Sequence, residues 1–452
     1  MKLVCVLGLC VLITLSLGNI SPIHAQAGTV QLLWTNPMQV IDQAVSKDGN
    51  FIAALNNTGL YYFAWNDSSP RWWYLSGPAG AGMFLSVAIS ANGEYVVVGN
   101  MTSGSVYYFN NSRTRSGPQP SNTYTWISVH FWGFPNSDVE RGTIDISDNG
   151  EYVVVGGTGD SVYYFVDCTS KSGIMQVWTW SRSSGTGYVH AVDMSADGKY
   201  VAIGGPDPLA GPTGFVAFFK DANVFPYPAN HVWYAHLTGS IMDVVELAVS
   251  DDGYSVVAVS EAVPVTLYYW AGATGLSGDP APTWARQQGF SSVDMSSDGN
   301  RVVAGHGLIA SLYYWDHART RTGTDELENW RELESLNVYD VAINDDGNLI
   351  AAVAYNVTSG FYEVYFFTPS DELIDYFVLQ SRDYYISMSG NGQVTAVGGT
   401  PFDSLSVFTW QAPVGGQLLP VNMLELLVPY LLVFALAITG AVAVLFRGRI
   451  RR

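Results

Sequence analysis

Apolar residues recur along this chain in pairs of short runs that do not alternate with polar residues. The first run of each pair is β-branched, as in Tyr95–Gly99, and the second is aromatic, as in Ser105–Phe109. A strand that is apolar at almost every position is covered on both faces of its sheet. The pattern therefore predicts pairs of strands that are sandwiched between neighbouring units.

A short turn motif precedes each β-branched run. It reads Ser-x-Asp-Gly or a close variant, as in Ser195–Gly198. Asp-Gly or Asn-Gly between apolar runs is a strong hairpin signal, because these residues accept the positive φ of tight turns. The motif occurs eight times, with 44 to 57 residues between successive glycines. The predicted turn glycines are Gly49, Gly93, Gly150, Gly198, Gly253, Gly299, Gly347 and Gly392.

Each unit ends in a fourth strand that usually carries tryptophan. We predict this strand at Trp34, Trp73, Trp126, Trp180, Trp233, Trp284 and Trp330, with Tyr376 in its place in the last unit. One such unit cannot bury its own two faces, so the units must stack and close into a ring. The predicted fold class is all-β: an eight-bladed β-propeller of four-stranded blades, with seven blades as the alternative count.

The two ends of the repeat region predict how the ring closes. The region begins with a tryptophan strand, Gln31–Asn36, and ends with an aromatic strand before Pro413. We expect the first strand to complete the last blade, which would join the ends without a disulfide. Deleting residues 28–36 should then destabilise the whole ring.

The order of strand, turn, strand and aromatic strand resembles WD-repeat and YVTN-type surface propellers, notably in DMSADGKYVAIGG (193–205) and DISDNGEYVVVGG (145–157). The stretches at 163–178 and 313–330 also resemble the tryptophan-docking motif of quinoprotein-type repeats, in which an Asp, a Gly and a Trp tie adjacent blades together. The resemblance covers residues 30–413 and implies the fold, not the function. No Trp-Asp dipeptide ends the third strand and no Gly-His pair precedes the first, so this is a divergent propeller.

The ends of the chain predict a protein that is held in a membrane. Residues 1–27 read as a signal peptide, with an apolar core and an Ala-x-Ala site before Gly28. Residues 425–446 are long enough and apolar enough for one transmembrane helix, and the arginines of the tail at 447–452 place that tail in the cytoplasm. The propeller at 28–413 and a linker at 414–424 then lie outside. An uncleaved N-terminal anchor and a buried core helix are the alternatives.

Charge and cysteine content exclude several classes of function. Without Lys2, Glu425 and the four tail arginines, 15 basic residues face 38 acidic ones, a net charge near −23. Such a surface repels nucleic acid, so we expect no nucleic-acid partner. Cys168 is the only cysteine of the predicted outer region, which rules out an internal disulfide there; a buried thiol is favoured over a bond to a partner chain.

Candidate chemistry in the outer region is sparse. Asp145, Asp193 and Asp294 begin a string that resembles half of a calcium loop, but its twelfth position lacks the required glutamate, so a turn or channel-lining role is favoured. No two histidines of this region have metal-ligand spacing beside a carboxylate except the loose pair His231 and His236, for which surface or core placement is favoured over a metal site. We therefore predict no catalytic residues, no cofactor and no metal. The other histidines of this region are His130, His190, His306 and His317.

Sequons and loops suggest where the surface is modified and where it binds. The candidate glycosylation sites are Asn56, Asn66, Asn100, Asn110 and Asn356, four of them in the first two repeats. Long loops before the tryptophan strands, at 110–124, 220–231 and 271–283, are rich in Gly, Pro and aromatics and are expected on one rim. Binding usually lies in such loops, and plain connectors are the alternative.

Three functions fit these observations. The first is a membrane-anchored cell-surface propeller that acts as a non-catalytic scaffold for a protein or a glycan. The second is an extracytoplasmic enzyme, such as a lyase, lactonase or dehydrogenase, with its site at the channel mouth. The third is a structural component of an envelope lattice. Because propellers host all three, the fold cannot choose among them, and the missing catalytic constellation favours the first. Carboxylates or histidines that converge on the channel would favour the second.

Overall fold

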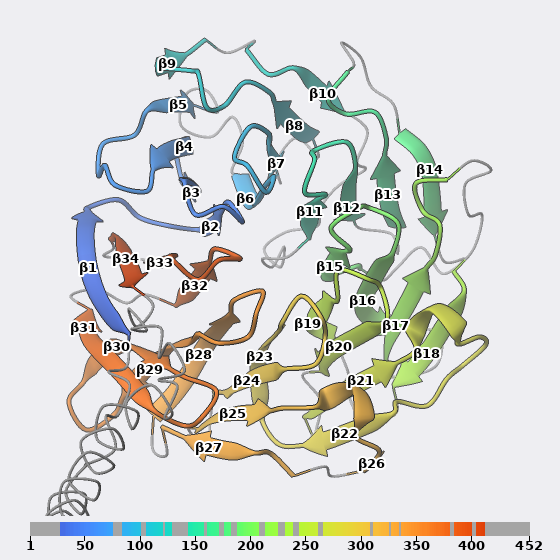
Figure 1. Cartoon of the computed structure of the whole chain (residues 1–452). Coiled ribbons are helices and arrows are strands. Elements are labelled where there is room, and N and C mark those ends of the chain that lie inside the picture. Colours follow the sequence, from blue (N-terminus) through green and yellow to red (C-terminus); the bar gives the residue numbers. More distant parts are fainter. Residues whose placement is uncertain are drawn as a thin grey trace, which may run out of the picture. The chain divides into compact units, whose positions relative to one another are not determined.

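The computed structural model describes residues 28–411 apart from the segments 76–83, 101–104, 121–122, 129–142, 158–160, 171–175, 182–187, 208–212, 225–230, 238–243, 261–264, 308–310, 325–326, 334–335, 380–383 and 400–403. The predicted signal peptide, linker, transmembrane helix and basic tail lie outside the described residues, as does His130. Within residues 29–411 the strands form eight sheets arranged around a common centre (Figure 1). The predicted eight-bladed propeller is confirmed.

Each blade is a meander of four antiparallel strands that runs outward from the centre. Blades 1 to 4 are β2 (Asp42–Val45), β3 (Phe51–Asn56), β4 (Gly59–Ala64) and β5 (Trp72–Leu75); β6 (Phe84–Ile89), β7 (Val96–Asn100), β8 (Ser105–Phe109) and β10 (Trp126–Ser128); β11 (Ile144–Ile146), β12 (Val153–Gly157), β13 (Ser161–Phe165) and β14 (Gln176–Ser181); and β15 (Ala191–Met194), β16 (Val201–Asp207), β17 (Thr213–Phe219) and β18 (Trp233–Leu237).

The second half of the ring repeats this arrangement. Blades 5 to 8 are β19 (Val244–Val249), β20 (Ser255–Ser260), β21 (Thr266–Ala271) and β22 (Trp284–Gln287); β23 (Phe290–Met295), β24 (Val302–His306), β25 (Ser311–Trp315) and β27 (Trp330–Glu332); β28 (Leu336–Ile343), β29 (Ile350–Asn356), β30 (Phe361–Phe367) and β31 (Leu373–Leu379); and β32 (Tyr385–Met388), β33 (Val394–Gly398), β34 (Leu405–Gln411) and β1 (Thr29–Asn36). Two 3-10 helices, η1 (Ala273–Gly275) and η2 (Ala318–Thr320), follow β21 and β25.

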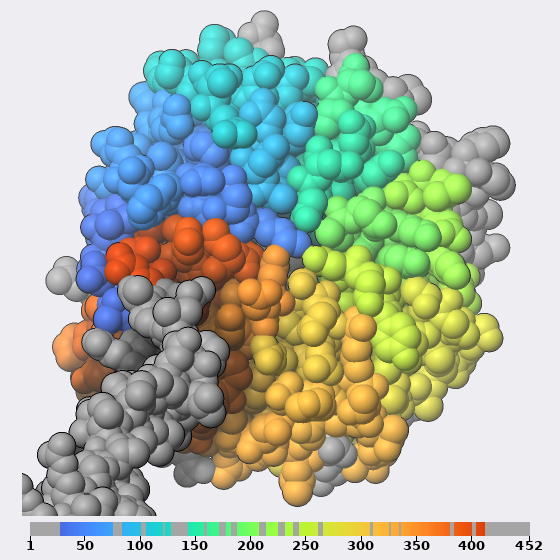
Figure 2. Space-filling model, viewed as in Figure 1, coloured from blue at the N-terminus to red at the C-terminus, as the bar shows by residue number. Residues whose placement is uncertain are grey.

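The core lies between the blades. The second strand is buried at every position in blades such as the third, β12, and the fifth, β20. Each apolar cluster joins two neighbours: one contains Ile203 and Phe219 of blade 4 together with Tyr164 and Trp178 of blade 3. The blades touch one another around the ring in chain order (Figure 2). Continuous apolar runs are thus explained by a neighbouring blade on each face.

The Ser-x-Asp-Gly turns have the same geometry in every blade. All eight predicted glycines adopt φ between 65° and 76°. At Gly150 a Cβ atom would also lie 2.2 Å from the ring of Tyr95, so only glycine fits there. The turn serine completes the motif: the Ser147 Oγ accepts a hydrogen bond from the Tyr152 backbone N–H and donates one to Asn149.

The chain closes on itself as the ends of the repeat region predict. Strand β1 pairs antiparallel with β34, from Thr29 opposite Gln411 to Asn36 opposite Leu405. The first strand of the chain is therefore the outer strand of blade 8, and in Figure 1 the blue β1 lies beside the red strands. Among the described residues Cys168 is a buried thiol that forms no disulfide, so this closure is non-covalent.

The eight residues predicted to mark the fourth strand all lie in the outer strands of the blades, and tryptophans of these strands dock on the following blade. In blades 1 and 3 the indole N–H groups that donate to the following blade are those of Trp72 and Trp178, which bond to Ser112 O and Ala222 O. In blade 7 the paired position is occupied by Asp375, opposite Phe366, while Tyr376 is 52% exposed. In the other blades the indole N–H groups that donate to the following blade are those of Trp34, Trp126, Trp233, Trp284 and Trp330.

Two of the three long loops serve as straps between blades. The loop at 110–124 provides β9 (Gly117–Gln119), a fifth strand parallel to β5 of the preceding blade. The loop at 271–283 bridges back through Gly278 to Trp233 of blade 4, and β26 (Gly323–Thr324) pairs in the same way with β22. These loops therefore make contacts between neighbouring blades. No helix among the described residues is long and apolar enough to cross a membrane.

Candidate functional site in the central channel

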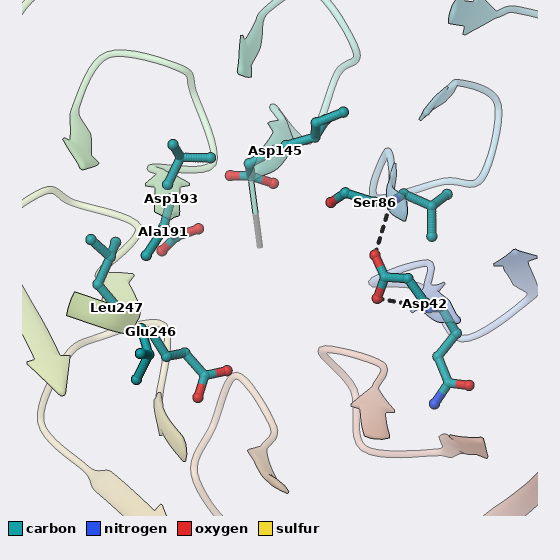
Figure 3. A pocket seen from close by; sticks show the side chains of 12 residues that line it. Asp42, Ser86, Asp145, Ala191, Asp193, Glu246 and Leu247 are labelled. Carbon is teal, nitrogen blue, oxygen red and sulfur yellow. Dashed lines mark hydrogen bonds between the residues drawn. The ribbon is translucent and has the colours of Figure 1, made fainter. Parts of the chain in front are cut away.

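The innermost strands bring carboxylates together in the central channel. A cavity of about 230 Å³ lies among the inner strands of blades 1 to 5. Asp42, Asp145, Asp193 and Glu246 line it, and their carboxylates point toward its interior (Figure 3). The twelve lining residues include no lysine, arginine or histidine. The enzyme alternative requires such a convergence of carboxylates, so the contacts of each carboxylate decide its role.

These carboxylates connect neighbouring blades. The Asp42 carboxylate accepts a hydrogen bond from the Val87 backbone N–H of blade 2 at 2.8 Å. The Glu246 carboxylate likewise accepts one from the Val293 N–H of blade 6 at 2.9 Å. The other such contacts are Asp145 with Met194, Asp193 with Val249, Asp294 with Ile343 and Asp340 with Ile386. Each carboxylate thus satisfies a backbone donor of the next inner strand, which is a structural role.

The sequence predicted half of this set. Asp145, Asp193 and Asp294 lie two residues before the turn serine; the structure places Asp145 and Asp193 in the cavity lining, and Asp294 makes the equivalent contact between blades 6 and 7. Asp42, Glu246 and Asp340 lie four residues before the turn Ser or Asn and were missed. Residues two and four positions before the turn residue lie on the same face of the inner strand, because side chains alternate between the two faces of a strand. This alternation could have predicted Asp42, Glu246 and Asp340 as well.

Burial changes the protonation of the channel carboxyls. It raises the pKa of Asp145 to about 6 and that of Asp294 to about 7. Burial, together with the charge of Asp145, also raises the pKa of Asp193 well above its usual value. Removing a carboxylate from water disfavours its charged form, and the backbone hydrogen bonds offset this only in part. The channel therefore takes up protons near neutral pH.

This uptake predicts a stability that falls as pH rises. In the unfolded chain these carboxyls titrate near pH 3.9. Between about pH 4 and pH 7 the folded state binds more protons, so the free energy of unfolding decreases through that interval. We expect the melting temperature to drop by roughly 5 °C between pH 5 and pH 8. Calorimetry at both pH values measures this drop.

A matched pair of variants tests the source of this pH dependence. Asp294→Asn keeps an oxygen for the Ile343 N–H and removes the titrating group, so the decrease in melting temperature from pH 5 to pH 8 should become smaller. Asp67→Asn, at an exposed position, should leave this decrease unchanged. A melting temperature that rises from pH 5 to pH 8 in the unmodified protein would contradict the assignment.

One lysine crosses the mouth of the channel on the turn side. The Lys47 ammonium lies 3.3 Å from Asp148, 2.9 Å from Asp251 and 3.4 Å from Asp345, which are turn residues of blades 3, 5 and 7. Burial alone would lower the pKa of Lys47, but the hydrogen bond to Asp251 and the three negative charges raise it overall. Lys47 therefore stays charged and ties alternate blades together across the channel axis.

The histidines are scattered rather than grouped. His306 is buried in blade 6, and His190 stacks on Tyr188 in the inner part of blade 4. His236 lies on the outer strand of blade 4, where its Nδ1 is 3.1 Å from Asp279. Among the residues that the structure describes, no group of three or more His, Cys, Asp or Glu side chains is arranged to hold a metal ion.

The sequons lie on both faces of the disc. Asn56 and Asn356 end second strands, whereas Asn66 and Asn110 follow third strands. Because strand direction alternates within a blade, these two positions lie at opposite ends of the strands. Asn66 is exposed, whereas the side chain of Asn100 is 2% exposed, which leaves little room for a glycan there.

Comparison with known proteins identifies the fold. No protein-family model matches the chain, and no curated protein sequence matches it. The structure is similar to the C-terminal WD40 domain of Sif2, with a TM-score of 0.60 and 12% identity over 84% of this chain and 98% of that one. It is also similar to the Dos1 propeller, with a TM-score of 0.60 and 12% identity over 85% and 94%. At this identity the likeness shows a WD40-type β-propeller fold.

Proposed function

We propose that this chain is a non-catalytic propeller that binds a protein partner at the cell surface. The apolar segment at 425–446 would hold it in the membrane, and the signal peptide would place the propeller outside. One observation carries the proposal: most of the exposed large apolar side chains among the described residues belong to blades 7 and 8, and several lie on β31, the uncovered outer strand of blade 7.

Exposed large apolar side chains concentrate on these two neighbouring blades. Tyr376 and Val378 of β31 are each 52% exposed, and Phe361 of β30 is 54% exposed. Strand β1 contacts β31 and adds further members. We call this set the blade 7/8 strip; its residues are Leu32, Leu33, Val357, Phe361, Leu373, Tyr376 and Val378. Apolar groups gathered on one surface mark an interaction site more often than scattered ones do.

The edge of β31 has the form of a docking site for an extended segment. In blades 1 and 5 the outer strands, β5 and β22, are covered by the parallel strands β9 and β26. Among the described residues no fifth strand covers β31. An uncovered edge offers free backbone donors and acceptors, and an extended peptide with apolar side chains can pair with it. We therefore infer that the partner protein adds such a segment to β31.

The contacts in the channel disfavour the enzyme alternative. A general acid or base must reach a substrate, whereas the channel carboxylates are engaged with backbone N–H groups of adjacent blades. Their raised pKa values have a structural cause, which is burial. A catalytic role for Asp145 would require it to leave the hydrogen bond that holds blade 4.

Site-specific cross-linking tests the proposed binding edge. A photo-crosslinking amino acid in place of Tyr376 should give one dominant adduct with another protein in intact membranes. The same group in place of Leu75, which is 46% exposed on the covered blade 1, should give none. Mass spectrometry of the adduct identifies the partner. An adduct within the same chain, to residues 412–424, would show that the edge is covered internally and would overturn the proposal.

Substitution of the strip gives the matching loss of binding. Tyr376→Ser combined with Val378→Ser should weaken partner binding at least tenfold, because both changes remove apolar area from the contact. The melting temperature should stay unchanged, since both side chains are exposed. Leu75→Ser is the control, because it also replaces an exposed apolar side chain by serine, but on blade 1; it should leave partner binding unchanged. If binding survives the double substitution, the partner docks elsewhere.

A further inference from the structure

The channel cavity is lined by a serine whose hydroxyl group has no partner in the fold. Ser86 lies in β6 of blade 2 with 2% of its surface exposed, and its Oγ has no hydrogen-bond partner among the described residues. Its hydroxyl points into the cavity among the inner strands of blades 1 to 5 (Figure 3). A buried hydroxyl without a partner costs free energy, so we expect its partner to lie in the cavity.

The equivalent serine of blade 6 does have a partner. Ser292 occupies the same position, four residues before its turn serine, and its Oγ donates to the Asp340 carboxylate of blade 7 at 2.8 Å. The residue that corresponds to Asp340 in blade 3 is Thr143. Ser86 therefore lacks the acceptor that Ser292 has, which leaves its hydroxyl available to a ligand.

Gln43 adds a second buried group of this kind. It is 3% exposed and lines the same cavity. Its Nε2 donates to Tyr385 O at 3.0 Å and to Ala396 O at 2.9 Å, and these two bonds fix the orientation of the amide. Its Oε1 has no hydrogen-bond partner among the described residues, and an amide oxygen can only accept. The lining therefore offers a hydroxyl and an amide oxygen that the described residues leave unused.

The carboxyl groups of the cavity do not require a ligand of opposite charge. Each of the four accepts a hydrogen bond from a backbone N–H of the next blade. Burial raises the pKa of Asp145 to about 6, and burial together with the charge of Asp145 raises the pKa of Asp193 well above its usual value. A carboxyl that keeps its proton donates a hydrogen bond as well as accepting one. The cavity therefore suits an uncharged ligand whose polar groups can do both.

The rest of the lining is apolar and favours an organic ligand over water alone. Val87, Ile144, Val192 and Leu247 lie beside the polar groups of the cavity. Water would satisfy the polar groups but would leave these side chains hydrated, whereas a ligand with both C–H and O–H groups satisfies both kinds of surface. The cavity, at about 230 Å³, is also much larger than the space that one water molecule needs. A compound with several hydroxyl groups on a carbon frame fits this lining.

We propose that the channel cavity binds a small neutral polyhydroxyl compound, such as a monosaccharide unit, through the Ser86 hydroxyl and the Gln43 Oε1. Ser86 donates a hydrogen bond to one ligand hydroxyl and accepts one from another, and Gln43 accepts one. The C–H groups of the ligand contact the apolar side chains of the lining. The ligand can be a free sugar or the terminal unit of a glycan, since both carry the same chemistry. The site is separate from the blade 7/8 strip and does not depend on it.

Ligand-observed nuclear magnetic resonance on the full chain, in a detergent without a sugar head group, tests this site. The probes are D-galactose, myo-inositol, lactose and the positively charged D-glucosamine. We expect saturable binding of at least one of the three neutral probes, with a dissociation constant on the order of 1 mM. Tighter binding of lactose than of D-galactose indicates the end of a glycan, and the reverse order indicates a free sugar. Binding of D-glucosamine alone, or of none of the four, would overturn the proposal.

Two matched serine variants assign the binding to the cavity. Ser86→Ala should weaken binding about fivefold, because a hydrogen bond to the ligand is lost, whereas Ser292→Ala should change it less than about twofold. Without sugar the melting temperatures should show the opposite order. Ser86→Ala should melt within about 1 °C of the unmodified chain, since its hydroxyl has no partner among the described residues, and Ser292→Ala should melt lower, since the Asp340 carboxylate loses a donor. Equal losses of binding in both variants, or no loss in Ser86→Ala, would show that the sugar does not bind in this cavity.

Discussion

Deletion of residues 28–36 is expected to abolish cooperative unfolding of the propeller near its normal melting temperature. The deletion removes β1, which forms seven residue pairs with β34 and is the whole outer strand of blade 8. It also removes the buried Val30 and the Trp34 hydrogen bond to Trp65 O of blade 1. At about 1 kcal/mol for each lost backbone hydrogen bond, the cost approaches the total stability of a typical domain.

The loss of stability is expected to extend through the ring, because blade 8 depends both on β1 and on its contacts with blade 1. Its inner strand contacts blade 1 through Gln43, whose side-chain amide donates to Tyr385 O and Ala396 O. Without β1 the outer face of β34 is open, and Phe408 loses the neighbouring Val30. Blade 8 can then no longer cover the apolar face of blade 1.

Differential scanning calorimetry of the deletion and of two point variants distinguishes this mechanism. Val30→Asp places an unpaired charge in the same cluster and should mimic much of the deletion. Leu33→Ser, at a position of β1 that is 40% exposed, should leave the melting temperature within about 2 °C. If the shortened chain melts at the same temperature as the full chain, β1 does not close the ring.

The fold could be predicted because its signals are local. A turn glycine with positive φ and a strand that is buried on both faces are each properties of a few consecutive residues. Eight copies of the same short pattern leave little freedom for another architecture. The closure of the ring by β1 could be predicted from the same pattern, because the repeat region begins with the strand type that its last unit lacks.

The sequence predicted the outer strands, but not which of two nearby tryptophans docks on the next blade. In a strand a shift of one residue moves every side chain to the other face. Trp72 and Trp73 are adjacent, so composition alone cannot tell which one points to the next blade. In blade 3 Trp178 and Trp180 lie two residues apart on the same face of β14, and both are buried against blade 4.

The channel site was harder to predict than the fold, because its contacts join distant parts of the chain. The Asp42 carboxylate meets a backbone N–H 45 residues away, and Asp193 meets one 56 residues away. Only the closed ring brings these groups together. Ser86 became notable only in the structure, where its buried hydroxyl has no hydrogen-bond partner among the described residues.

Trp72→Ala is expected to lower the free energy of unfolding by about 3–5 kcal/mol, as for other large buried aromatic residues. The Trp72 ring is fully buried, and it stacks 5.2 Å from Tyr62 of its own blade and 5.6 Å from Phe109 of blade 2. Its indole N–H donates to Ser112 O across the same boundary at 2.8 Å. The residue therefore contributes both apolar area and a buried hydrogen bond between two blades.

The neighbouring tryptophan provides the control. Trp73→Ala should cost less than about 1 kcal/mol, because its ring is only half-buried on the opposite face of β5. Trp72→Phe should fall between the two: it keeps an aromatic ring but leaves the buried Ser112 carbonyl unsatisfied, at a cost of about 1–3 kcal/mol. Chemical denaturation of the three variants measures this order. Equal costs at positions 72 and 73 would mean that the indole does not join the blades, and the stability of the ring would have to come from the strand contacts alone.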